Sequence, residues 1–216
     1  MIRVLIVDDH AIMRQGLSSL LTDQPDVEVV GDTGDGRTAI DMVRTHSPDV
    51  VVMDVGMPEL NGIDATRRIR VEYPRTRVIA LSTHTDGRYV QHMLEAGACG
   101  YVLKIAAYDE LLRAVRAASV GRTYLSSQIA GGVVETALQG RTGVDGTAGV
   151  KLGTREREVL QLVAEGKTSA EAAKAMHISV KTVETHRRNI VAKLGLHGTA
   201  ELTKYAIREG LTSTEQ

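Results

Sequence analysis

Phenylalanine and tryptophan are both absent from this 216-residue chain, so its hydrophobic core must be built from aliphatic side chains, alanine and methionine. Cys99 is the single cysteine, which excludes an intramolecular disulfide and fits the reducing cytoplasm. No apolar run approaches the ~18 residues needed to cross a bilayer. The N-terminal residues enter a strand pattern without the features of a signal peptide. These absences predict a cytoplasmic protein that does not engage a membrane.

The charged residues are unevenly distributed, although the net charge is only −1. Residues 151–216 carry 11 Lys and Arg against 8 Asp and Glu, whereas the rest of the chain carries 15 against 19. An acidic region joined to a mildly basic one suggests separate partners, but the asymmetry alone does not establish DNA binding. Residues 139–150 contain four glycines and no proline, a composition typical of a flexible tether. We predict domains over residues 1–121 and 151–216, joined by a linker over residues 122–150.

Short apolar segments alternate with helical patterns in the first of these domains. The expected strands are residues 2–7, 27–30, 49–54, 77–81 and 100–103. The expected helices are residues 10–21, 38–45, 62–73, 87–96 and 109–119. The apolar run at residues 50–53 shows no alternation, which suits a strand buried on both faces of a parallel sheet. The pattern predicts an α/β domain with a doubly wound, five-stranded parallel sheet.

Polar residues follow the strands of this predicted sheet where each strand ends. Asp8 and Asp9 follow the first strand and Asp54 ends the third, while Ser82 and Lys104 follow the fourth and fifth. The carboxyl ends of parallel strands form one edge, where ligands bind in open α/β sheets. A lone aspartate after a strand is usually a turn former. The shared position of all five residues instead favours a common site.

The chemistry of these residues suits phosphoryl transfer. Three gathered carboxylates would repel one another unless a cation joins them, and Mg²⁺ prefers such oxygen ligands. Lys104 supplies a positive charge for a phosphoryl oxygen, and Ser82 supplies a hydroxyl donor. A carboxylate beside Mg²⁺, here Asp54, can attack phosphorus and form an acyl phosphate.

The second domain shows four short helical patterns and no strand candidate over residues 154–209. They start at Thr154, Ser169, Val180 and Thr199, and we expect Thr154, Ser179 and Thr199 to act as helix caps. The third pattern, residues 180–194, places apolar side chains on one side and short polar ones on the other. Such a helix fits the major groove of B-DNA, although an ordinary amphipathic surface helix shows the same periodicity.

Six side chains on or beside this polar face are candidate DNA contacts. Arg188 is a candidate partner for guanine, Glu184 for a cytosine amine and Thr185 for a thymine methyl group. Lys181, Thr182 and Lys193 are placed for phosphates.

Short segments of the first domain match a known family in order and spacing. These segments are Val7-Asp8-Asp9-His10, Met53-Asp54-Val55-Gly56-Met57-Pro58, Asn61-Gly62, Leu81-Ser82 and Tyr101-Val102-Leu103-Lys104. On them, residues 1–121 resemble the receiver domain of response regulators. The resemblance implies that Asp54 is the phosphoacceptor and that Mg²⁺ binds Asp8, Asp9, Asp54 and the Gly56 carbonyl. It also implies that Ser82 and Lys104 bind the phosphoryl group and that Tyr101 turns inward on activation.

The second domain resembles the LuxR-type helix-turn-helix. The matching segments are residues 152–160, 179–190 and 193–195. Ser169 and Ala172 depart from the pattern, since asparagine and isoleucine are usual there. The whole chain thus resembles a NarL/FixJ-type two-component response regulator. That resemblance implies promoter DNA and a sensor histidine kinase as partners, DNA reading by the third helix and a homodimer supported by the fourth.

The favoured function is a transcription factor whose DNA binding is controlled by phosphorylation of Asp54, through dimerisation. The added phosphate would act on a bistable surface of the fourth strand, fourth helix and fifth strand. Beyond slow self-phosphorylation and self-dephosphorylation, no enzymatic activity is expected. Two alternatives stay open. One is a phosphatase or nucleotide-binding enzyme using Asp54, which lacks a glycine-rich phosphate loop because Asp8-Asp9-His10 stands there. The other is a DNA-binding regulator independent of phosphorylation.

Overall fold

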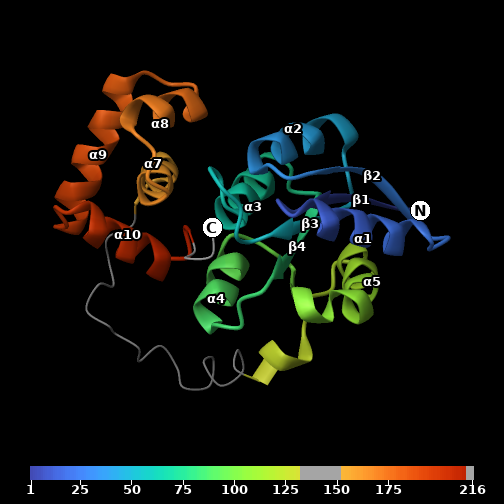
Figure 1. Ribbon diagram of the computed structural model, residues 1–216. Helices are drawn as coiled ribbons and strands as arrows, with labels where there is room; N and C mark the ends of the chain where they lie inside the picture. The colour runs from blue at the N-terminus through green and yellow to red at the C-terminus, as the bar shows by residue number, and fades with distance from the viewer. Residues whose placement is uncertain (132–151, 213–216) are drawn as a thin grey trace. The chain divides into compact units, whose positions relative to one another are not determined.

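The computed structural model describes residues 1–131 and 152–212 (Figure 1). The chain divides into two compact units, Met1–Leu138 and Gln139–Gln216, each described here by itself. The tether expected at residues 139–150 lies outside the described residues. Within the described ranges, no helix combines the length and hydrophobicity that a membrane span requires.

The first unit is built on a parallel sheet with the strand order β2-β1-β3-β4-β5-β6. The strands are β1 (Ile2–Val7), β2 (Val27–Thr33), β3 (Val50–Asp54), β4 (Arg77–Ser82), β5 (Gly100–Leu103) and β6 (Tyr124–Leu125). The doubly wound parallel sheet is confirmed, but the prediction of five strands was one short. The missing strand, β6, has only two residues, and so short a strand carries no periodic signal.

Helices cover both faces of this sheet (Figure 1). They are α1 (Ala11–Thr22), α2 (Gly36–His46), α3 (Gly62–Glu72), α4 (Gly87–Glu95) and α5 (Ala107–Ser119), with a 3₁₀ turn over Lys104–Ala106. Residues of α1 and α5 pack in one apolar cluster, while residues of α2 and α3 pack in a second and those of α4 in a third. The strands between them supply alternate residues to opposite faces, as period-two geometry requires.

Strand β3 lies between two of these clusters. All five of its residues are buried. Val50 and Val52 belong to the cluster under α1 and α5, whereas Val51 and Met53 belong to the cluster under α2 and α3. The prediction of a strand buried on both faces is therefore confirmed.

Two element boundaries of the first unit differ from the prediction for local reasons. Helix α2 starts two residues earlier than expected because the Asp35 side chain accepts a hydrogen bond from the Thr38 amide at 2.6 Å and caps it. Strand β2 continues past Gly31 to Thr33, although glycine was expected to end it. A Cβ at Gly31 would lie 2.5 Å from the Met42 methyl group, so this glycine provides space for packing and does not form a turn.

The described part of the second unit is helical, as predicted. Its helices are α7 (Thr154–Ala164), α8 (Ser169–Met176), α9 (Val180–Leu194) and α10 (Thr199–Arg208). They enclose a small apolar core that includes Leu160, Val183, Ile190, Leu202 and Ala206. This core is separate from the clusters of the first unit.

The helix caps of the second unit are partly as expected. Ser179 caps α9 by accepting a hydrogen bond from the Thr182 amide at 3.1 Å, as predicted. Thr154 and Thr199 were wrongly predicted as caps, since each is the first helical residue. The true cap positions are glycines, whose amides donate to the carboxylates of Glu156 and Glu201 in the first turn. These glutamates satisfy the amides of the cap residues, whereas no side chain at the cap position accepts from the first turn.

Candidate functional site

The strand ends of the first unit bring three charged side chains together. Lys104 Nζ lies 2.8 Å from Asp8 Oδ2 and 2.8 Å from Asp54 Oδ2. The side chains of Asp8, Asp54 and Lys104 are 0%, 5% and 10% exposed. Residues separated by up to 96 positions thus meet at one sheet edge, the juxtaposition that the strand order predicts.

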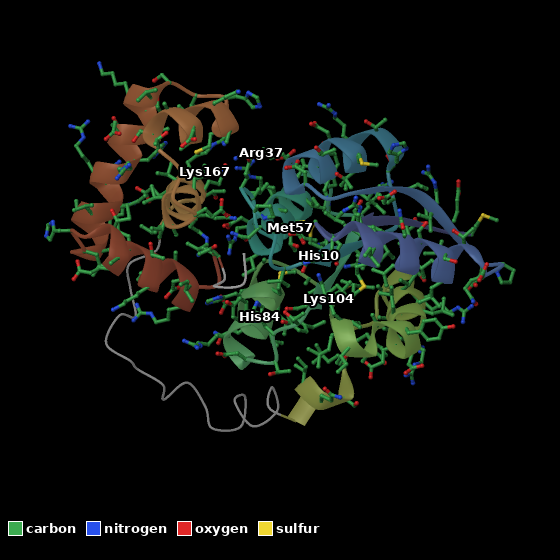
Figure 2. The ribbon with its side chains drawn as sticks, in the orientation of Figure 1. His10, Arg37, Met57, His84, Lys104 and Lys167 are labelled. Carbon is green, nitrogen blue, oxygen red and sulfur yellow. The ribbon has the colours of Figure 1, made fainter. Side chains whose placement is uncertain are left out.

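Asp9 and His10 extend this cluster toward solvent. Potential ligand atoms of Asp8, Asp9, His10 and Asp54 all lie within 4.8 Å of one another. His10 Nδ1 lies 2.8 Å from Asp9 Oδ1 and 3.3 Å from Asp8 Oδ1. Figure 2 shows His10 on the same side of the unit as Lys104. His10 appeared in the sequence only as part of a motif, and its approach to both carboxylates was not predicted.

The donor set fits a hard divalent cation. Three carboxylates face one space, and the buried Oδ1 of Asp9 has His10 Nδ1 as its neighbour at 2.8 Å. Oxygen donors of this kind are those that Mg²⁺ prefers. The Asp8, Asp9 and Asp54 side chains would hold the ion. The Gly56 backbone follows Asp54 by two residues, and its amide donates to Asp54 Oδ1 at 3.3 Å.

The protonation of the pocket is set by burial and by the lysine. Burial raises the pKa of Asp54 to about 6, assisted by the neighbouring Asp8 charge and opposed by Lys104. Burial alone would lower the pKa of Lys104, but the two carboxylates outweigh it and raise the pKa above its ordinary value. Lys104 is therefore a fixed cation at neutral pH. Asp54 is an anion at that pH, and burial makes its ionised form less favourable than it is in water.

The loop after β3 is fixed by two residues that the sequence offered only as a motif. Asn61 caps α3 by accepting a hydrogen bond from the Asp64 amide at 2.8 Å. The Gly62 amide donates to the Val55 carbonyl at 3.0 Å, and a Cβ at Gly62 would lie 1.9 Å from the Asp54 carbonyl oxygen. Only glycine allows α3 to approach the end of β3 this closely.

Ser82 and Tyr101 both hold the loop that follows β4. Buried Ser82 accepts a hydrogen bond at its hydroxyl from the His84 amide, at 3.0 Å. Tyr101 is fully buried and donates its hydroxyl hydrogen to the His84 carbonyl at 2.8 Å. The His84 ring stacks on Tyr89 with a centroid separation of 4.1 Å. His84, labelled in Figure 2, was not predicted as a site residue. Tyr101 occupies an inward position here, and its switching role stays a prediction.

A groove of about 740 Å³ opens beside this pocket between α1 and α5. His10, Thr83 and Lys104 line its end nearest the carboxylates. Along the groove stand the exposed apolar side chains of Ile12 and Ile105, 87% and 88% exposed. Tyr108, also on the groove, is 78% exposed.

In the second unit, the six predicted DNA-contact residues all lie on the exposed side of α9. They are Lys181, Thr182, Glu184, Thr185, Arg188 and Lys193, opposite the buried Val183 and Ile190.

Two of the six have hydrogen-bond partners in other helices of the unit. Lys193 Nζ donates to Glu156 Oε2 of α7 at 2.7 Å, and Glu184 accepts a hydrogen bond from the Ser169 hydroxyl of α8. The Arg187 guanidinium donates to the same Ser169 oxygen at 3.1 Å. Ser169, which departs from the family pattern, thus joins α8 to α9. These contacts come from other helices, so the periodicity of α9 alone did not reveal them.

Comparison with known proteins gives each unit a family. Residues 4–116 match the response regulator receiver domain, and residues 150–206 match the luxR family of bacterial regulatory proteins. The chain is 39% identical over 213 residues to the transcriptional regulatory protein LiaR of Bacillus subtilis (strain 168), covering 99% of this chain and 100% of that protein. It is 37% identical over 213 residues to the oxygen regulatory protein NreC of Staphylococcus haemolyticus (strain JCSC1435), covering 97% and 98%.

The solved structures that resemble this chain are also response regulators. A LuxR-family response regulator from Aurantimonas sp. SI85-9A1 is 36% identical with a TM-score of 0.61, over 63% of this chain and 97% of that one. The response regulator RcsB, solved as a complex with DNA, is 26% identical with a TM-score of 0.60, over 96% and 98%.

The first unit is thus a receiver domain, and the second is a LuxR-type DNA-binding domain. The chain belongs to the two-component response regulators of the NarL/FixJ family, and its relatives LiaR and NreC are both named as regulatory proteins.

Proposed function

We propose that Asp54 accepts a phosphoryl group from a sensor histidine kinase in the cytoplasm, and that the modification controls promoter binding by α9. The observation that supports this proposal is the buried arrangement of Asp54, Asp8 and Lys104 at one sheet edge. We further propose residues 1–121 and 151–216 as the functional domains, with residues 122–150 as the linker between them.

In the proposed transfer, a carboxylate oxygen of Asp54 attacks the phosphorus of a phosphohistidine. The new P–O bond forms as the P–N bond breaks, and the histidine nitrogen leaves with the electron pair and takes a proton from water. Mg²⁺, when bound, neutralises charge on the transferred group. Lys104 Nζ, already 2.8 Å from Asp54, pairs with a phosphoryl oxygen. The Ser82 hydroxyl accepts from the His84 amide, and in the phosphorylated state it would donate to another phosphoryl oxygen.

The groove between α1 and α5 is the proposed docking surface for the kinase. It reaches Lys104 and His10 at one end, so a helix of the kinase lying in it would bring its histidine to the phosphoacceptor. Ile105→Ser and Tyr108→Ala each change one exposed side chain of the groove and no buried side chain. We expect both variants to slow phosphorylation by the kinase but not by acetyl phosphate, which needs no docking surface. Equal slowing with both donors would contradict this assignment.

The proposed DNA interface is the exposed face of α9 in a homodimer. One recognition helix reads few bases, and pairing two half-sites adds their binding energies. RcsB was solved as two dimers bound to DNA, and the present chain is 26% identical to it with a TM-score of 0.59. Arg188, Glu184 and Thr185 are proposed for base contacts. Lys181, Thr182 and Lys193 are proposed for phosphates, and Lys193 would first have to leave Glu156.

The decisive experiment compares wild type with Asp54→Ala, each with and without acetyl phosphate and Mg²⁺. The probe is a DNA fragment enriched from a random library by the wild-type protein. We expect acetyl phosphate to tighten DNA binding and promote dimers in wild type only. Equal affinity in all four samples would instead support a regulator independent of phosphorylation. Slow self-dephosphorylation predicts decay of the acyl phosphate without turnover of an external substrate.

A further inference from the structure

Ser126 is a fully buried polar residue that the phosphoryl transfer described above does not use. It directly follows β6, and its backbone amide donates to the Tyr101 carbonyl at 2.9 Å. Residues 127–131 continue from it as a helix. Ser126 therefore lies where the chain leaves the sheet and enters the helix at residues 127–131.

The Ser126 hydroxyl makes two hydrogen bonds at once. It donates to the carboxylate of Glu110 in α5, and it accepts from the Leu103 amide at 3.2 Å. Glu110 is itself only 9% exposed. A hydrogen bond to a buried carboxylate is among the stronger ones in proteins, so this contact is costly to break.

These two partners stand on either side of Lys104 in the chain. Leu103 precedes the lysine directly, and Glu110 lies in the first turn of the helix that follows it. The Ser126 hydroxyl thus joins strand β5, which ends just before Lys104, to helix α5, which follows Lys104.

The same segment also contacts the surroundings of Tyr101. Leu125 pairs with Tyr101 as β6 adds to β5. Ile129, 4% exposed, packs in the cluster that contains Tyr101, Leu103 and Val90 of α4. Residues 124–129 therefore touch both the support of Lys104 and the core around the tyrosine.

We propose that Ser126, held by Glu110, is a positioning residue that couples the Lys104–Asp54 pair to the segment leading out of the receiver unit. The inference rests on the proposed phosphorylation of Asp54. When Lys104 exchanges its contact with Asp54 for phosphoryl oxygens, the displacement passes through Leu103 and Glu110 to Ser126. It then alters the start of the helix at residues 127–131.

The test uses the full chain as wild type, Ser126→Ala and Ser127→Ala. Ser127 is the exposed neighbour and serves as the matched control. For each protein, acetyl phosphate and Mg²⁺ are added, and three quantities are measured. These are the lifetime of the acyl phosphate on Asp54, the ratio of DNA affinities with and without phosphorylation, and hydrogen exchange over residues 124–131.

We expect wild type and Ser127→Ala to show the same affinity ratio and a change in hydrogen exchange on phosphorylation. Ser126→Ala should still be phosphorylated, with an altered acyl-phosphate lifetime. Its affinity ratio should fall roughly fivefold, the lower end of typical coupling between sites. Its hydrogen exchange over residues 124–131 should no longer respond to phosphorylation. A wild-type ratio and a wild-type exchange response in Ser126→Ala would overturn the inference.

A second variant keeps the inference testable if Ser126→Ala does not fold. Glu110→Leu keeps a side chain of similar size but removes the oxygen that accepts from Ser126. A reduced affinity ratio supports the coupling, and an unchanged ratio overturns it. The two proposals fail in different ways. A wild-type protein without any response to acetyl phosphate refutes the proposed function, whereas a responsive wild type with an equally responsive Ser126→Ala refutes only the coupling.

Discussion

In the receiver unit, Asp8, Asp54 and Lys104 are at most 10% exposed and are paired with one another. In the DNA-binding unit, Lys181, Glu184, Arg188 and Lys193 of α9 are exposed, and Glu184 and Lys193 each contact one neighbouring helix. Burial makes charges expensive, so a buried cluster persists only when its members compensate one another. Charges at the surface are solvated and need no such compensation, and a surface ion pair contributes little to the free energy of unfolding. Changes in the pocket should therefore have larger effects than changes on the helix face.

The largest effect is expected for Gly62→Ala. The new Cβ would lie 1.9 Å from the Asp54 carbonyl oxygen, so the β3–α3 loop or the strand end has to move. We expect a loss of about 3 kcal/mol in the free energy of unfolding, as for severe overpacking. Phosphorylation at Asp54 should fall with it. Denaturant unfolding and the phosphorylated fraction measure the two effects.

Gly87→Ala is the matched control for this substitution. Gly87 is the first residue of α4, and a Cβ there meets nothing within 4 Å. Its stability should be unchanged or slightly higher. Wild-type stability and phosphorylation in Gly62→Ala would show that the close approach of α3 to Asp54 is not required.

A smaller effect of opposite sign is expected for Asp54→Asn in Mg²⁺-free buffer. Burial raises the pKa of Asp54 to about 6 from an ordinary 3.8, so the folded state binds a proton more tightly than the unfolded state. The ionised group thus lowers stability above pH 6, and this penalty disappears as the pH falls toward 4. The substitution should stabilise the protein by about 1–3 kcal/mol at pH 7.5, since one pKa unit is worth ~1.4 kcal/mol.

Unfolding experiments at several pH values measure this gain, which should vanish near pH 4. Asp41→Asn, at a side chain 69% exposed, should show neither the gain nor its pH dependence. A gain for Asp54→Asn that is the same at pH 4 and pH 7.5 would rule out the burial of charge as its cause.

The smallest effects are expected on α9, where Lys193→Ala and Lys181→Ala form a pair. Lys193 contacts Glu156, so its loss should reduce stability by no more than about 1 kcal/mol. Lys181→Ala should leave stability unchanged. If Lys181 contacts a phosphate, its loss should weaken binding to all DNA sequences evenly and lower the salt dependence by about one unit. Thermal unfolding and salt titrations of DNA binding separate the two roles. A sequence-selective loss in Lys181→Ala would identify a base contact instead.

The same contrast explains how far the sequence predicts this molecule. The predicted strand order placed Asp8, Asp54 and Lys104 together. All three come at the carboxyl ends of parallel strands, and those ends lie along one edge of the sheet. Helical periodicity likewise placed the six α9 residues on the exposed face. What these patterns cannot reveal is contact between elements that lie far apart in the sequence.

Three particular residues show this limit. The bonds of Ser126 to Leu103 and Glu110 depend on a two-residue strand without periodicity. His84 became a site residue only because Ser82 and Tyr101 both reach its backbone. The third, Lys193, pairs with a glutamate 37 positions earlier in the chain, which no spacing rule indicates.

The position of β3 between two packed clusters has a mechanical consequence. Alternate residues of this strand pack in two separate hydrophobic clusters. A shift of the strand toward one cluster would therefore open a void in the other. A newly attached group on its terminal aspartate therefore cannot be accommodated by moving the strand. The segments that move must instead be the neighbouring loops. These segments carry the hydroxyl of Ser82 and the ammonium of Lys104.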